Sequence, residues 1–245
     1  MKRILKKLLN LTSTEGDSDS DARLGRQLYK GVWTDLSKTE GQAKLWVQGT
    51  EDEKQLDESA KDTLNKLQQT VGISKKDDVL EIGCGVGRVG SVLAPLCNNW
   101  TGCDVSPNML QYAAQRLKNY SNINFVEVSG YDLQPIEDSS VDMVYSTVVF
   151  MHLSEWDRYN YVEDAWRVLK EGGRLYIDNI SLTTDTGWEF FQSSRAIAPA
   201  ERPPQIGQTS TPDEFRVYLE KAGYQNIHVE VIHDAWVIGW AEKSG

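Results

Sequence analysis

The sequence predicts an α/β fold with a mainly parallel, seven-stranded sheet doubly wound by helices. Three observations predict it. Short apolar runs alternate with amphipathic stretches through most of the chain, which favours parallel strands joined by right-handed helical crossovers. Alternating glycines follow the first such run (Gly83, Gly85 and Gly87), as in a loop that leads from a strand into a helix beside a ligand. Two strand-like runs near the C-terminus, 227–232 and 235–241, predict an antiparallel hairpin that closes the sheet.

The same patterns predict the individual elements in order. Strands are expected near 78–82, 99–104, 123–128, 141–147 and 173–180, each short and rich in apolar residues. Helices are expected between them, near 88–96, 107–117 and 156–169. A further helix is expected to begin at Thr211, a suitable N-cap followed by Pro212 at the first helical position, and to end at Gly223.

Residues 1–70 differ in kind from the rest. Residues 1–11 have a basic amphipathic pattern that could rest on an anionic membrane surface, dock on a partner or form a packed first helix. An acidic stretch without periodicity follows, up to residue 21, and is typical of a flexible tether. Residues 1–21 are therefore predicted to form one unit. Residues 22–70 have helical periodicity and are expected to form a cap over the carboxyl edge of the sheet, with the remaining core spanning 71–245.

The composition and charge of the chain exclude some classes of function. The 245 residues are 40% hydrophobic and carry a formal net charge of −10, without a long basic stripe in the predicted folded part. Nucleic acid is therefore not an expected partner, since phosphate contacts need Lys and Arg. No apolar run approaches the roughly 20 residues of a membrane span. The three cysteines, Cys84, Cys97 and Cys103, lack ligand-like spacing, which together with the lack of a secretory signal favours a reducing, cytoplasmic location.

Two acids accompany the glycine loop. Asp104 stands at the end of the second predicted strand, where a carboxylate can accept hydrogen bonds from a ribose. Glu81 lies two residues before Gly83, where a cofactor with an ammonium group would use it. Residues 85–90 also fit the dinucleotide G-x-G-x-x-G pattern, so an NAD-dependent oxidoreductase is an alternative, opposed by Glu81 and by the terminal hairpin.

With its E-x-G-x-G-x-G loop at residues 81–87, the chain resembles the class I S-adenosylmethionine-dependent methyltransferases. Four further segments match in order, at 104–110, 125–133, 141–153 and 166–175. The resemblance implies a Rossmann-like methyltransferase fold with S-adenosylmethionine as the cofactor. It implies that the loop and Glu81 approach the methionine part of the cofactor. It also implies that Asp104 binds the ribose and that Ser146 faces the sulfonium. The residues that it implies for cofactor binding are Glu81, Gly83, Cys84, Gly85, Gly87, Asp104, Val105, Met109, Gly130, Tyr131, Asp132 and Ser146.

The acceptor side is less defined. His152 follows the fourth predicted strand and is the candidate base, because a histidine can take a proton from a hydroxyl near neutral pH. Residues 181–211 form a long segment expected to be irregular and to act as a lid. Asp178 and Asn179 are expected just after the fifth strand, but two oxygen ligands are too few to predict a metal site. Candidate acceptor-binding residues are Tyr29, Trp33, Phe150, Trp188 and Arg195, and Trp46 is a further candidate pocket wall.

The sequence therefore predicts methyl transfer to a small-molecule acceptor, with a hydroxyl preferred and a sugar, glycan or lipid-linked compound among the candidates. The alternatives are the NAD-dependent oxidoreductase and a non-catalytic partner subunit of the same fold. The sequence predicts neither the identity of the acceptor nor the oligomeric state.

Overall fold

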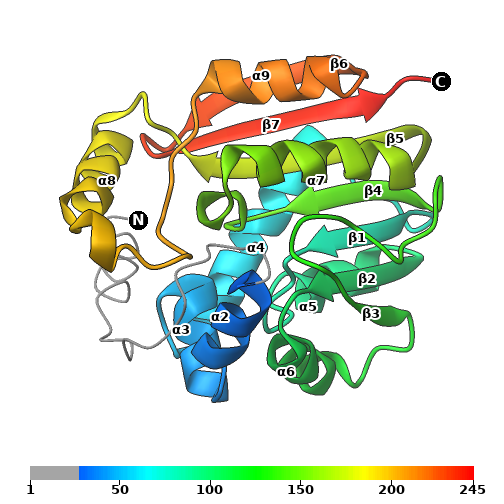
Figure 1. Cartoon of the computed structure of the whole chain (residues 1–245). Helices are drawn as coiled ribbons and strands as arrows, with labels where there is room; N and C mark the ends of the chain where they lie inside the picture. Colours follow the sequence, from blue (N-terminus) through cyan, green and yellow to red (C-terminus); the bar gives the residue numbers. More distant parts are fainter. Residues whose placement is uncertain (1–27) are drawn as a thin grey trace.

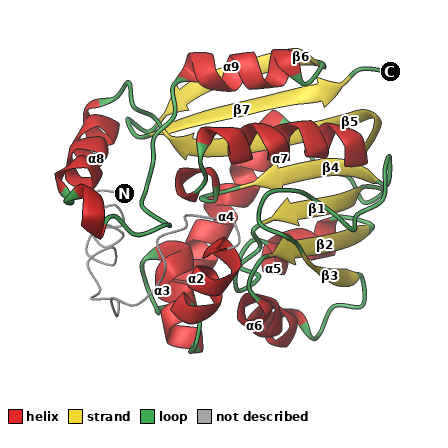
Figure 2. Cartoon of the chain, viewed as in Figure 1, coloured by secondary structure: helices red, strands yellow, loops and turns green. Residues whose placement is uncertain are grey.

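The computed structural model describes residues 28–245 as a sheet flanked by helices (Figures 1 and 2). The basic segment 1–11 and the tether that follows it lie outside the described residues, so their roles stay predictions. The helices are α2 (Leu28–Leu36), α3 (Glu40–Gln48), α4 (Glu53–Thr70), α5 (Gly90–Leu93), α6 (Pro107–Leu117), α7 (Glu155–Val168), α8 (Asp185–Ala196) and α9 (Pro212–Lys221). The strands are β1 (Asp78–Ile82), β2 (Asn99–Asp104), β3 (Ile123–Glu127), β4 (Val141–Ser146), β5 (Leu169–Ile180), β6 (Tyr224–Ile232) and β7 (Trp236–Lys243). Short 3-10 helices are η1 (Ala94–Leu96), η2 (Phe150–His152) and η3 (Pro199–Glu201).

The seven strands form one sheet in the order β3-β2-β1-β4-β5-β7-β6. The first five are parallel, with Ile82 of β1 opposite Cys103 of β2 and Ser146 of β4. β7 runs antiparallel between β5 and β6. The predicted fold class, including the C-terminal hairpin, is confirmed. The order reverses at β1, and open α/β sheets bind ligands at such a switch point, beyond the carboxyl ends of the strands.

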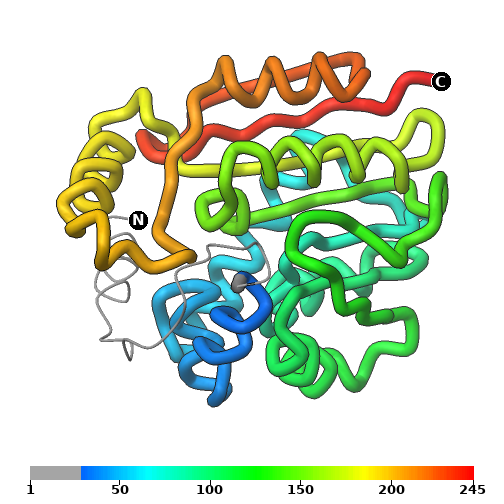
Figure 3. Tube along the Cα trace, viewed as in Figure 1, coloured from blue at the N-terminus to red at the C-terminus, as the bar shows by residue number. Residues whose placement is uncertain are grey.

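Helices cover both faces of the sheet. On one face α7 and α9 pack on it through buried side chains such as Tyr161 and Phe215. On the other face α4, α5 and α6 pack around the fully buried Trp100, through residues such as Leu67 and Leu93. The helices α2 and α3 lie at the carboxyl ends of the parallel strands, and α8 lies at the same end, near β5 (Figures 1 and 3). No helix within residues 28–245 is long and apolar enough to cross a membrane.

Helix starts follow the capping chemistry of the sequence. Ser106 caps α6 by accepting a hydrogen bond from the backbone N–H of Met109, with Pro107 at the first position. Thr211 does the same for α9 through the N–H of Glu214. Both side chains satisfy a donor that the helix itself leaves unpaired. The capping of α6 matters for the site, because it fixes the start of the helix only a few residues after Asp104, at the end of β2.

Two predictions from the sequence need correction. The segment 181–211 is not irregular throughout, because it contains the twelve-residue helix α8, capped by Thr184 and packed through Phe190. The fifth strand begins earlier than expected, at Leu169, and Asp178 and Asn179 belong to β5 instead of following it. Asp178 there accepts a hydrogen bond from the backbone N–H of Val148, at 2.7 Å.

Candidate functional site

A cavity opens at the carboxyl ends of β1, β2 and β4, under the helices α2 and α3. It encloses about 850 Å³, part of it open to solvent. The glycine loop, the end of β2, the segment around η2 and the two covering helices form its wall. Its position at the reversal of strand order is the expected place for a ligand in this architecture.

The glycine loop packs closely against the side chains of Val149 and Val47. Gly83 and Gly85 have positive φ values of +68° and +52°, which side-chain-bearing residues rarely adopt. A Cβ on Gly83 would lie 2.4 Å from Cγ2 of Val149, and one on Gly85 would lie 2.6 Å from Cγ2 of Val47. Glycine is therefore required at both positions by conformation and by space.

Asp104 binds the loop and keeps acceptor capacity. Its Oδ2 accepts a hydrogen bond from the N–H of Gly85 and its Oδ1 accepts one from the N–H of Ser106, both at 2.9 Å. Burial raises the pKa of this carboxyl to about 6, and the hydrogen bonds from Ser106 and Gly85 oppose the rise. Each oxygen has a further lone pair, so Asp104 can still accept hydrogen bonds from two neighbouring hydroxyls, as a ribose offers.

Glu81 is held by a chain of buried hydrogen bonds. The hydroxyl of Tyr145 donates to Oε2 of Glu81 at 2.6 Å, and the indole N–H of Trp100 donates to the same hydroxyl at 3.1 Å. Burial raises the pKa of Glu81 to about 8, although the bond from Tyr145 and the charge of Arg88 lower it. A cation placed in the cavity would favour the ionised form, so the site suits a ligand with an ammonium group.

Apolar side chains form the rest of the cofactor end. Val105 and Met109 line the cavity beside Asp104. Tyr29 of α2 lies against Gly130 in the same wall, where a Cβ on Gly130 would lie 3.5 Å from Cβ of Tyr29. The apolar surface of Val105 and Met109 suits the face of a flat ring next to the ribose position.

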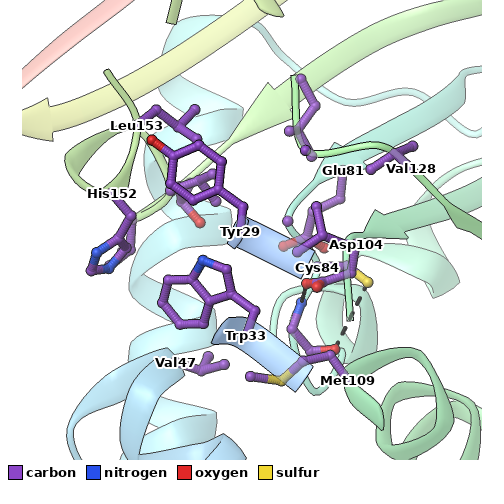
Figure 4. Close-up of a pocket in the computed structure, with 18 of the residues that line it drawn as sticks. Tyr29, Trp33, Val47, Glu81, Cys84, Asp104, Met109, Val128, His152 and Leu153 are labelled. Carbon is purple, nitrogen blue, oxygen red and sulfur yellow. Dashed lines mark hydrogen bonds between the residues drawn. The ribbon is translucent and has the colours of Figure 1, made fainter. Parts of the chain in front are cut away.

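His152 stands on the other side of Tyr29 and Trp33 from the two acids (Figure 4). Its Nδ1 lies 2.8 Å from the carbonyl oxygen of Gln205, and its ring contacts that of Trp33 with centroids 4.9 Å apart. A carbonyl can only accept, so Nδ1 carries the hydrogen and Nε2 has the free lone pair. Burial lowers the pKa of His152 to about 4, so the imidazole is neutral at physiological pH.

The guanidinium of Arg158 connects η2 with the segment at the start of α9 through hydrogen bonds. Its Nε donates to the carbonyl of Phe150 at 3.0 Å, while its Nη1 donates to Ser210 and Glu214, both at 2.8 Å. The side chain of Arg158 is 3% exposed, so these bonds are shielded from water. Because His152 belongs to η2 and binds the backbone of Gln205, this buried connection fixes the position of its ring.

The structure brings together eleven of the residues that the sequence singled out. The cavity is lined by Tyr29, Trp33, Glu81, Gly83, Cys84, Gly85, Asp104, Val105, Met109, Gly130 and His152. The candidate wall residue Trp46 also lines it.

Seven predicted site residues lie outside the cavity lining: Gly87, Tyr131, Asp132, Ser146, Phe150, Trp188 and Arg195. Ser146 is fully buried between strands, and Phe150 packs against Phe215 in the core. Trp188 and Arg195 are exposed on α8. Asp132 accepts a hydrogen bond from the hydroxyl of Ser129 in its own turn.

Several lining residues were not predicted as site residues, and they fall into two groups. Eight are apolar or hydroxyl side chains that carry no sequence signal of their own, and they come from α3, α7 and the segments at or after the strand ends: Val47, Ile82, Val128, Thr147, Val148, Val149, Leu153 and Tyr161. Arg88 also lines the cavity, and a cation directly after a glycine loop was a signal that could have found it. Within residues 28–245, no group of three or more His, Cys, Asp or Glu is arranged to hold a metal ion.

Comparison with known proteins assigns the family. Residues 80–177 match a methyltransferase domain family. The chain is 33% identical over 180 residues to demethylmenaquinone methyltransferase from Tropheryma whipplei, covering 64% of this chain and 70% of the relative. It is 26% identical over 233 residues to 27-O-demethylrifamycin SV methyltransferase from Amycolatopsis mediterranei, covering 91% and 76%.

Solved structures agree on the fold. The N-methyltransferase NodS from Bradyrhizobium japonicum, in complex with S-adenosyl-L-homocysteine, superposes with a TM-score of 0.61 at 16% identity, covering 88% of this chain and 98% of NodS. The cavity described above fits the same cofactor, because Asp104 has free acceptor capacity for a ribose and Glu81 can pair with an ammonium group. These relatives set aside the NAD-dependent alternative. The chain belongs to the class I S-adenosylmethionine-dependent methyltransferases and is an enzyme that uses S-adenosylmethionine.

Proposed function

We propose that this methyltransferase acts on a hydroxyl group of a small, uncharged organic acceptor. The distribution of charge around the cavity carries this proposal. The charged side chains among the described lining residues are Glu81, Arg88 and Asp104, all between β1 and the end of β2. The opposite wall consists of Tyr29, Trp33 and apolar neighbours, and favours an acceptor that is apolar and without formal charge.

His152 is proposed to receive the proton of the acceptor hydroxyl. S-adenosylmethionine supplies a methyl group on a sulfonium, a very good leaving group, so the protein needs mainly to align the acceptor and exclude water. The lone pair on Nε2 of His152 can accept a hydrogen bond from the hydroxyl and then its proton. Because the pKa of His152 is about 4, its basicity is low, which favours an acidic hydroxyl such as a phenol over an alcohol.

The names of two relatives, a rifamycin and an erythromycin O-methyltransferase, agree with this class of acceptor. The name 27-O-demethylrifamycin SV methyltransferase places the methyl group on an oxygen of an organic compound. A glycan or lipid-linked hydroxyl is also an oxygen acceptor, but it is an alcohol, so the low basicity of His152 favours it less than a phenol. We further propose that residues 22–70 cap the cavity and that residues 181–211 cover the acceptor, which the tie between Gln205 and His152 supports.

An acceptor series on one flat scaffold tests the proposal. The purified enzyme is given S-adenosylmethionine with 2-naphthol, 2-naphthylamine, naphthalene-2-thiol or 2-naphthoic acid, and formation of S-adenosylhomocysteine and methylated product is measured. Methylation of the naphthol in preference to the other three is expected. Methylation of only the amine, the thiol or the carboxylate would refute the hydroxyl preference.

A pair of variants tests the base. His152→Ala removes both ring nitrogens, whereas His152→Gln keeps a side-chain amide that can still donate to Gln205. Both should lower kcat on the naphthol by roughly 10²-fold or more, with unchanged binding of S-adenosylhomocysteine. Full activity in His152→Gln would show that the residue only supports the lid.

A further inference from the structure

Arg88 is a buried cation for which the described protein offers no close anion. It lies in the cavity wall, 5% exposed, one residue after the glycine loop. Its Nη1 donates to the hydroxyls of Ser59 and Thr63 on α4, at 3.3 and 3.2 Å. Among residues 28–245, no carboxylate oxygen lies within 4.0 Å of the guanidinium.

Its Nε is buried and has no hydrogen-bond partner. Buried polar groups are nearly always paired, and an unpaired charged donor in a low-dielectric site is especially unfavourable. Burial lowers the pKa of Arg88, and the negative charges of Glu81 and Asp178 oppose this effect from a distance. A guanidinium stays protonated under these conditions, so the site holds a fixed positive charge that a bound anion would pair.

Arg88 and Glu81 together match a zwitterion. Both line the same end of the cavity, beside Gly83, and they do not form an ion pair with each other within the 4.0 Å limit. An α-amino acid end carries an ammonium and a carboxylate on one carbon. A buried acid and a buried base that remain separate provide one partner for each group.

We propose that Arg88, which lines the cavity and has no carboxylate partner among residues 28–245, binds the α-carboxylate of the methionine moiety of S-adenosylmethionine through its guanidinium. The inference rests on the cofactor assignment above and not on the proposed acceptor. A carboxylate on the acceptor has the same chemistry, but the position of Arg88 next to the glycine loop favours the cofactor.

Calorimetric titration without acceptor tests the assignment on the full chain. The ligands are S-adenosylhomocysteine, its decarboxylated analogue, which keeps the amine, and 5′-methylthioadenosine, which lacks the amino acid. The proteins are the wild type, Arg88→Gln and the control Arg116→Gln, whose guanidinium pairs with Glu53 outside the cavity wall.

We expect Arg88→Gln to weaken S-adenosylhomocysteine binding roughly 10- to 100-fold, the range of a charge-assisted hydrogen bond. Binding of the other two ligands should change by less than about threefold, because they lack the carboxylate. The wild type should itself prefer S-adenosylhomocysteine over the decarboxylated analogue by about the same factor. Arg116→Gln should bind all three ligands as the wild type does.

Two results would overturn the inference while leaving the cofactor assignment intact. One is an equal loss for all three ligands in Arg88→Gln, which indicates a role in holding α4. The other is an unchanged affinity for S-adenosylhomocysteine, which would leave the guanidinium free for an acceptor carboxylate. A wild type that binds none of the three ligands would instead refute the cofactor assignment and the inference with it. If Arg88→Gln does not fold, Arg88→Lys replaces it. An equal loss of affinity for S-adenosylhomocysteine and for its decarboxylated analogue would then overturn the inference.

Discussion

Replacing Glu81 by glutamine is expected to stabilise the protein in the absence of cofactor. Burial raises the pKa of Glu81 from 4.5 to about 8, so between these values the folded state keeps a proton that the unfolded state has lost. The wild type therefore loses stability as pH rises from about 4.5 to 8 and levels off above. At about 1.4 kcal/mol per pKa unit, the loss reaches about 3 kcal/mol at pH 7 and about 4 kcal/mol at pH 8. Glutamine has a similar shape, can accept the bond from Tyr145 and does not titrate.

Urea unfolding at pH 5 and pH 8 measures this effect. The free energy of unfolding of Glu81→Gln minus that of the wild type should grow by about 3 kcal/mol between the two pH values. Glu58→Gln, on the exposed side of α4, is the matched control and should show no such growth. If Glu81→Gln and the wild type keep the same difference at both pH values, Glu81 is not a buried, proton-binding group and the electrostatic reasoning fails. The same variant should bind S-adenosylhomocysteine more weakly, because it cannot offer a negative charge to the ammonium.

Three further outcomes follow from the contacts. Asp104→Asn should weaken S-adenosylhomocysteine binding by roughly 10- to 100-fold in a calorimetric titration, because it loses the charge that strengthens the bonds to the ribose. In the pH profile of kcat/KM, His152 should give no inflection near pH 6.5, since its pKa is about 4; an inflection near 6.5 that disappears in His152→Gln would contradict this. Arg158→Met should lower the free energy of unfolding, measured by chemical denaturation, by about 3–5 kcal/mol, because it leaves Glu214 without its buried partner. A change below about 1 kcal/mol would contradict the proposed connection between η2 and the segment at the start of α9.

Sequence patterns were sufficient for the sheet because its central strands, such as β1 and β4, are mostly buried and clear helix signals separate the strands. The run of residues 78–82 is apolar apart from its two acids, and the caps at Ser106 and Thr211 fix the starts of α6 and α9. The extent of β5 was not predictable in this way. Leu169 is followed in β5 by the polar residues Lys170 and Glu171, and Lys170 forms ion pairs with Asp78 of β1 and Asp142 of β4. Such a contact joins residues far apart in the sequence and leaves no local pattern.

The cofactor end of the site was more predictable than the acceptor end for a physical reason. Glu81, Gly83 and Asp104 are each drawn from very few residue types, because only Asp and Glu carry a carboxylate and residues other than glycine rarely adopt a positive φ. The acceptor end is made of apolar residues that many others could replace. Val148 illustrates the limit, since a β-branched residue with φ +64° is unusual and is held there by the bond from its N–H to Asp178. No sequence pattern indicates that conformation.

Two buried ionisable groups, Glu81 and Arg88, make the binding end of this enzyme electrostatically unfavourable while no ligand is bound. Glu81 is held in a site that favours its neutral form, and Arg88 lies in the same wall with an unpaired Nε. Both groups would be better solvated in the unfolded chain, so each lowers the stability of the empty protein. A ligand with a positive and a negative group on one carbon satisfies both at once, and its binding free energy includes the relief of the two penalties. Cofactor binding should therefore raise the thermal stability of the wild type more than that of Glu81→Gln, and a thermal shift that is equal in the two proteins at saturating S-adenosylhomocysteine would contradict this explanation.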